Sequence, residues 1–106
     1  MSLSTHVLDT TRGEPAAGVP VRLDRLDHDG WSAPAEGVTG PAGRLAVSAA
    51  PLAAGRHRLC FDVAAHHGPG AFFPEVAVVF DVADPDRHLH LPLLLSPFGY
   101  TTYRGS

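Results

Sequence analysis

The 106-residue chain has a single cysteine, Cys60, and no apolar run long enough for a membrane-spanning helix, which needs about 20 residues. Residues 1–6 have neither the basic start nor the apolar core of a signal peptide, so we expect a soluble, unprocessed protein with no membrane partner. One cysteine excludes an intramolecular disulfide and a cysteine metal cage. It also favours a reducing compartment, and we therefore expect a cytoplasmic protein.

Basic residues are few and dispersed. All eight are arginine, they run from Arg12 to Arg104 without clustering, and the net charge is −3 with histidine neutral. Because a nucleic-acid-binding surface needs a basic stripe, we expect no nucleic-acid partner.

Eleven glycines and ten prolines leave little room for long helices. Apolar and polar residues instead alternate with a period of two, which is typical of strands with one buried face. One such face is predicted to carry His57, Leu59, Phe61 and Val63, and another Leu89, Leu91, Leu93 and Leu95. Strands are predicted at residues 5–9, 19–26, 31–39, 56–63, 76–82 and 88–95, and a helical turn only within residues 64–73. Seven or eight short strands without crossover helices predict one all-β domain over residues 1–106, an antiparallel two-sheet sandwich.

Histidine is abundant, with seven in the chain. Four lie beside predicted turns, charges or loops and are expected to be surface histidines: His28, His57, His66 and His67. His88 and His90 differ, because an i, i+2 pair on a strand points the same way. They form either a polar outer face or a half-buried pair whose pKa is displaced, as a neutral base near pH 7 requires. Together with His6 they could also hold zinc, although the spacing does not require it.

Two arginines have alternative interpretations. Arg44 follows a Gly-Pro-Ala-Gly turn and is predicted to start a strand. Its side chain is either a solvated turn residue or a fork of donors for a carbonyl or an anion. Arg104 lies beside Tyr103 near the end of the chain, where it would bind a ligand, pair across an interface or shield an edge strand. The sequence contains no nucleophile elbow, phosphate loop or acidic dyad.

Both ends of the chain carry recognisable motifs. The opening segment Leu3-Ser-Thr-His-Val-Leu-Asp-Thr10, continuing through residues 13–20, and the closing segment from His88-Leu-His90 to Tyr103-Arg-Gly-Ser106 closely resemble the 5-hydroxyisourate hydrolases, the transthyretin-related proteins. Residues 39–45 look like the family's turn ending in Gly-Arg-Leu, and residues 72–76 like the start of its sixth strand. The resemblance covers nearly the whole chain.

This resemblance implies the transthyretin fold, with two four-stranded antiparallel sheets and one short helix after the fifth strand. It also implies a homotetramer, built as a dimer of dimers, with active sites at the dimer–dimer interface. The residues that match the family's catalytic motifs are His6, Arg44 and His90. Those expected to bind substrate are His6, Arg44, Tyr103, Arg104, Gly105 and Ser106.

The chain departs from the family's pattern at three positions. Leu89 replaces the aromatic residue usual between the two histidines, Thr101 replaces a common serine, and Gly40 stands where Asp or Asn is frequent. None of these departures removes a proposed catalytic group. The first two are expected to alter packing at the site.

The activity implied by the resemblance is hydrolysis of 5-hydroxyisourate to 2-oxo-4-hydroxy-4-carboxy-5-ureidoimidazoline, in the degradation of urate to allantoin. The family works without a metal ion or organic cofactor. The alternative is a non-enzymatic carrier like transthyretin, which binds a small hydrophobic ligand in a central channel. His6, Arg44, His90 and the terminal Tyr-Arg-Gly-Ser favour the hydrolase, because the carrier does not keep them as a set.

Overall fold

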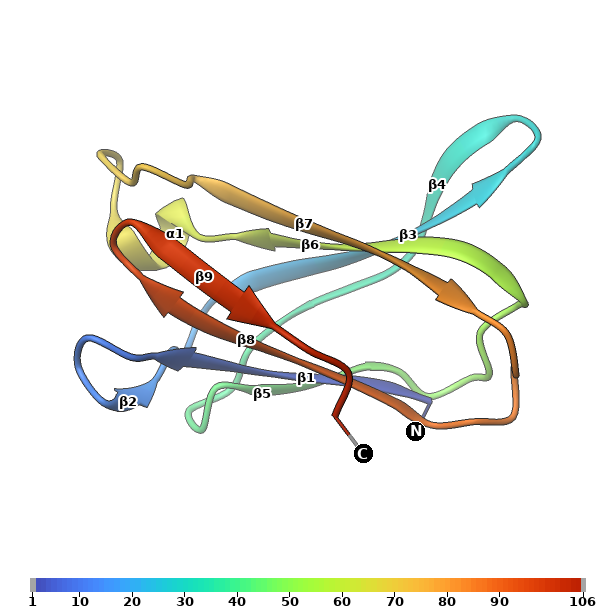
Figure 1. Cartoon of the computed structure of the whole chain (residues 1–106), viewed down its shortest axis with the longest axis horizontal. Helices are drawn as coiled ribbons and strands as arrows, with labels where there is room; N and C mark the ends of the chain where they lie inside the picture. The colour runs from blue at the N-terminus through green and yellow to red at the C-terminus, as the bar shows by residue number, and fades with distance from the viewer. Residues whose placement is uncertain (1, 106) are drawn as a thin grey trace.

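Two β-sheets stacked face to face form the molecule, and the computed structural model describes them over residues 2–105 (Figure 1). Ten elements follow one another along the chain: β1 (Leu3–Asp9), β2 (Glu14–Pro15), β3 (Pro20–Asp27), β4 (Gly30–Val38), β5 (Arg44–Ser48), β6 (Gly55–Asp62), α1 (Ala64–His67), β7 (Glu75–Val82), β8 (Leu89–Ser96) and β9 (Gly99–Thr102). Within the described residues, no helix is long and apolar enough to span a membrane.

The first sheet, here the β1 sheet, has the strand order β2-β1-β8-β9, with β5 also paired to β1. The second, here the β3 sheet, has the order β4-β3-β6-β7. The predicted all-β, transthyretin-like fold is therefore confirmed, with one added short strand, β2, and one parallel pair, β1 with β8. Two strands joined by a hairpin must run antiparallel. The chain between β1 and β8 instead passes through all the strands of the β3 sheet, so these two strands can pair in parallel.

The core lies between the sheets and is built by the alternation seen in the sequence. Leu59, Phe61 and Val63 are all buried, as are Leu93 and Leu95 of β8. The short helix α1 also falls within the predicted segment, and ends at His67. The predicted inner faces are thus confirmed.

The expectation that His57 is a surface histidine is wrong. Its side chain shares the inner face of β6 with Leu59, and the residue is only 1% exposed. The imidazole stacks on Phe80 with ring centroids 5.7 Å apart, and its Nδ1 lies 3.2 Å from the carbonyl oxygen of Gly55. The strand period, which decides which side chains face the core, outweighed the neighbouring turn and charges.

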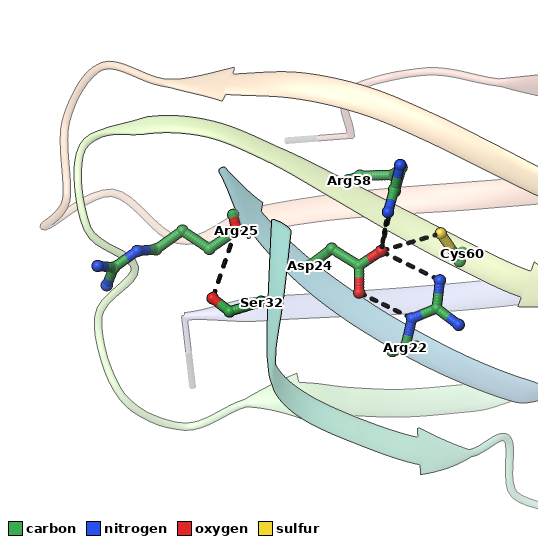
Figure 2. A network of polar contacts seen from close by, with 6 residues as sticks. All are labelled: Arg22, Asp24, Arg25, Ser32, Arg58 and Cys60. Carbon is green, nitrogen blue, oxygen red and sulfur yellow. Dashed lines mark hydrogen bonds and ion pairs between the residues drawn. The ribbon is translucent and has the colours of Figure 1, made fainter. Parts of the chain in front are cut away.

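An ion network covers the outer face of the β3 sheet (Figure 2). The Asp24 carboxylate, 3% exposed, accepts two hydrogen bonds from Arg22 at 2.7 and 3.1 Å and one from Arg58 at 2.8 Å. The Cys60 thiol lies 3.5 Å from the same carboxylate, and the Arg58 guanidinium sits 4.1 Å from the centroid of the Trp31 ring. The hydrogen bonds from Arg22 are the largest cause that lowers the pKa of Asp24, whereas burial raises the pKa of Cys60.

Candidate active site

A hollow of about 340 Å³ opens on the outer face of the β1 sheet. The strand registers explain why polar side chains meet there. Ser4 lies beside His90 across the parallel β1–β8 pair, and it lies opposite Ala46 across the β1–β5 pair. The residues that line the hollow are Ser4, Thr5, Arg44, Leu45, Ala46, His88 and His90.

A larger hollow of about 680 Å³ lies over the β3 sheet beside α1, and Arg22, Glu36 and Glu75 are among its lining residues. It contains none of the site residues predicted from the sequence. Volume alone does not assign a function, so the smaller hollow, which gathers histidines and an arginine, is the candidate site.

A tight turn sets the position of Arg44, the first residue of β5. Gly43 has a positive φ of 74°, and a Cβ there would lie 2.4 Å from the carbonyl oxygen of Val7. That position therefore accepts only glycine. The Gly43 carbonyl accepts a 2.8 Å hydrogen bond from the Val7 N–H, which fixes the turn against β1 and Arg44 at the hollow. Arg44 itself is exposed.

His90 is the half-buried histidine of the site. Burial is the largest cause that lowers its pKa below the usual value of 6.5, followed by the positive charge of Arg44. His6 and His88 act in the same direction. A lowered pKa keeps the imidazole neutral near pH 7, which is the form that can accept a proton.

Ser4 links the two histidines of β8 and was not predicted from the sequence. Its Oγ lies 2.8 Å from Nδ1 of His90 and 3.3 Å from Nε2 of His88. If His90 donates through Nδ1 to Ser4, and Ser4 donates to His88, then Nε2 of His90 keeps its lone pair. Only the parallel pairing of β1 with β8 reveals this contact, and no short motif predicts that pairing.

His6 lies two residues after Ser4 on β1 and is opposite Arg44 on β5. Its Nε2 is 2.9 Å from the carbonyl oxygen of Ala42. A carbonyl only accepts, so this nitrogen carries a hydrogen and Nδ1 holds the lone pair. Nε2 of His6 is then not available to a metal ion, so it is not a ligand atom for the zinc site that the sequence suggested for His6, His88 and His90. His6 borders the hollow and does not belong to its lining residues.

The C-terminal segment returns to His90. The Gly105 N–H donates a 2.7 Å hydrogen bond to the His90 carbonyl, and a Cβ at this glycine would lie 3.0 Å from Cδ2 of His90. Tyr103 and Arg104 are exposed, whereas Ser106 lies outside the described residues. The structure therefore brings Arg44, His90 and Gly105 to one place, with His6 at its border.

Fold and site together define the class of protein: a transthyretin-like sandwich with histidines and an arginine on the outer face of its β1 sheet. The chain belongs to the HIUase/Transthyretin family, whose model matches residues 3–105. The family resemblance inferred from the motifs is thus confirmed.

Two curated relatives match almost the whole chain. The chain is 42% identical over 112 residues to a 5-hydroxyisourate hydrolase of Caulobacter vibrioides, a match that covers 98% of this chain and 97% of the relative. It is also 42% identical over 120 residues to the uric acid degradation bifunctional protein TTL of Arabidopsis thaliana. That match covers 98% of this chain but only 37% of the plant protein, so the chain corresponds to one part of it.

Solved structures with this fold include a 5-hydroxyisourate hydrolase and a thyroxine-bound transthyretin. The 5-hydroxyisourate hydrolase of Klebsiella pneumoniae superposes with a TM-score of 0.85 at 42% identity, with 100% of both chains covered. Sea bream transthyretin in complex with thyroxine superposes with a TM-score of 0.88 at 36% identity, covering 99% of this chain and 95% of that one. Backbone similarity therefore does not distinguish the hydrolase from the thyroxine-bound transthyretin.

Proposed function

We propose that this protein hydrolyses 5-hydroxyisourate to 2-oxo-4-hydroxy-4-carboxy-5-ureidoimidazoline in urate degradation. Relatives of that name, about two-fifths identical along almost the whole chain, support the proposal. The observation that carries it is the pairing of a neutral, half-buried His90 with the cationic Arg44 at one hollow. Such a pair offers a proton acceptor and a fork of donors to a small polar ring.

The reaction adds water to a ring amide carbonyl, and a neutral amide and a neutral water react slowly. A catalyst must therefore take a proton from the water and stabilise the charge that develops on the carbonyl oxygen. His6 and His90 share the first role, with the base atom at Nε2 of His90 in the proton arrangement that Ser4 permits. Arg44 takes the second role, because its guanidinium is permanently charged and presents several N–H donors.

The C-terminus completes the proposed site. Tyr103, Arg104, Gly105 and Ser106 would hold the substrate ring, with Gly105 already bonded to the His90 carbonyl. In this proposal the protein is a homotetramer, a dimer of dimers, and a second subunit closes each hollow at the dimer–dimer interface. Exclusion of water on assembly would strengthen the charge interactions of Arg44. The unpaired Cys60 is compatible with a cytoplasmic location.

A carrier of a small hydrophobic ligand is the second candidate, favoured by the close superposition on thyroxine-bound transthyretin. The side chains at the hollow argue against it. Arg44, His88 and His90 would have to lose water to an apolar ligand without gaining new hydrogen bonds, which is unfavourable. The hydrolase is therefore the better interpretation.

The test is to generate 5-hydroxyisourate in situ from urate and to follow its ultraviolet decay with and without the protein. Wild type should accelerate the decay, and His90→Gln should lower the catalysed rate by about 10²-fold or more, since the base is removed. EDTA should leave turnover unchanged.

The control is His28→Gln, which alters a side chain that is 92% exposed and should keep full activity. A wild-type rate equal to the spontaneous one would contradict the proposal. In that case, saturable binding of a hydrophobic ligand such as thyroxine would support the carrier instead.

A further inference from the structure

A second group of ionisable side chains lies where β1 ends and α1 begins, away from the candidate active site. It consists of Asp9, the last residue of β1, with His66 and His67 of α1, and one ligand atom from each lies within 4.8 Å of the others. The side chains of Asp9 and His66 are only 3% and 12% exposed, although both histidines were expected at the surface. The proposed reaction uses none of these three residues.

We propose that Asp9, His66 and His67 form a site for a divalent transition-metal ion such as Zn²⁺. One carboxylate oxygen and two imidazole nitrogens are donors that Zn²⁺ binds readily, with a fourth position left for water. Among the described residues, these three are the histidine, cysteine and acidic side chains whose ligand atoms lie close enough together to hold a metal ion.

The contact between Asp9 and His66 already has nearly the required spacing. Oδ2 of Asp9 lies 2.7 Å from Nε2 of His66, a hydrogen-bond distance. Neighbouring ligands of a tetrahedral zinc ion are about 3.4 Å apart, given metal–ligand bonds near 2.1 Å. An ion can therefore replace the shared proton if the two groups separate by about 0.7 Å.

The third ligand requires a larger adjustment. The rings of His66 and His67 have centroids 5.1 Å apart and are tilted by 48°. The three ligand atoms lie within 4.8 Å of one another, a spread wider than the spacing of ligands around a bound ion. Because Asp9 and His66 are already 2.7 Å apart, the His67 ring is the one that must turn, toward Asp9. His67 is partly exposed, which leaves its side chain room to turn.

The carboxylate is held in the orientation that a ligand needs. Oδ1 of Asp9 accepts hydrogen bonds from the backbone N–H groups of Thr11 and Arg12, each at 3.0 Å, which leaves Oδ2 facing His66. Such partners fix a ligating group before the ion arrives. Nε of Arg12 lies 3.8 Å from Oδ2, but its side chain is 65% exposed and free to move away from a bound cation.

A bound ion would tie α1 to the end of β1 and so link the two sheets at this end of the sandwich. It would stabilise the folded chain, because the site does not exist when the chain is unfolded. Turnover at Arg44 and His90 does not depend on this site.

The experiment uses the full chain, freed of metal with EDTA and then desalted. Zn²⁺ is titrated in competition with a colorimetric chelator, and the unfolding temperature is measured with and without Zn²⁺. Co²⁺ provides a spectroscopic check, because a tetrahedral site gives intense visible bands. Wild type should bind one ion per chain and unfold at a higher temperature with Zn²⁺ present.

Three variants locate the ion. His67→Gln, which removes a partly exposed ligand, should weaken Zn²⁺ binding at least tenfold and abolish the Co²⁺ bands. The matched control His28→Gln should bind as wild type does, and so should His90→Gln, which alters the other histidine group. Unchanged binding in His67→Gln, or loss of binding in His90→Gln instead, would overturn the proposal.

Discussion

The outer faces of the two sheets both carry arginines beside an ionisable group, which is the buried Asp24 on the β3 sheet and the half-buried His90 on the β1 sheet. Their electrostatics are nevertheless opposite. On the β3 sheet, Arg22 and Arg58 surround the Asp24 carboxylate, whose pKa is lowered, so that every charge has a partner of opposite sign. On the β1 sheet, Arg44 adjoins His90, whose pKa is also lowered, because its own positive form is disfavoured. On the first face each charged group has a partner of opposite sign, whereas on the second the described residues place no carboxylate beside Arg44.

This difference separates a structural network from a binding site. Within the described residues, no carboxylate pairs with Arg44, and the other ionisable side chains that line the hollow are the histidines His88 and His90. A ligand oxygen that carries developing negative charge would supply the missing partner. The Asp24 network has no such vacancy, because two guanidinium groups and the Cys60 thiol already contact its carboxylate. Perturbed groups indicate function when their partners leave a charge unmatched.

The largest expected effect follows from removing the unmatched charge. Arg44→Gln should lower kcat/KM for 5-hydroxyisourate by about 10²-fold or more, because the oxyanion loses its charged donor. The charge of Arg44 lowers the pKa of His90, so its removal should raise that pKa. The acid limb of the pH–rate profile, where the base becomes protonated, should therefore move to higher pH.

The matched control is Arg87→Gln, which alters an exposed arginine outside the hollow. Its rate and its pH profile should equal those of wild type. The free energy of unfolding of Arg44→Gln should also stay within about 0.5 kcal/mol of wild type, since its side chain is exposed. An acid limb that stays in place would show that Arg44 does not act on the base.

The opposite result is expected on the β3 sheet. Asp24→Asn should lower the free energy of unfolding by about 2 kcal/mol, because two guanidinium groups lose their charged acceptor while both remain partly solvated. Catalysis should persist where the variant is folded. Since the pKa of Asp24 is lowered on folding, its contribution is complete above the unfolded value and is lost as the pH falls through the folded one.

Asp81→Asn is the matched control, measured by chemical denaturation in parallel. Asp81 pairs with Arg56 at 2.9 Å, but both side chains are more than half exposed. Exposed pairs contribute little to stability, so this variant should unfold nearly as wild type does. An Asp24 variant that lost turnover while fully folded would remove the contrast between the two faces.

Local sequence was sufficient for most of the fold and for part of the site. The period of two placed Leu59 and Phe61 in the core, and the turn before Arg44 correctly predicted the start of β5. The Asp24 network and the Ser4 contact depend on which strands become neighbours across more than 30 residues of sequence. No local pattern encodes such pairings, so these contacts became visible only with the sheet registers.

The smallest expected effect concerns Ser4, which we infer to be a positioning residue. Ser4→Ala removes the hydroxyl that lies 2.8 Å from Nδ1 of His90 and 3.3 Å from Nε2 of His88. One hydrogen bond contributes about 1 kcal/mol, which corresponds to a decrease in kcat of about fivefold to tenfold. KM should change little, because the hydroxyl orients the base and Arg44 remains in place.

A merely structural role would lower the folded fraction and leave the pH profile unchanged. A positioning role should shift the acid limb, since the hydroxyl is one of the groups that set the tautomer of His90. Ser4→Thr keeps a hydroxyl on a strand that tolerates a β-branched side chain, so it should restore most of the rate and the wild-type profile. If alanine and threonine behaved alike, the link between His88 and His90 through Ser4 would have no part in catalysis, and the site face would depend on Arg44 and His90 alone.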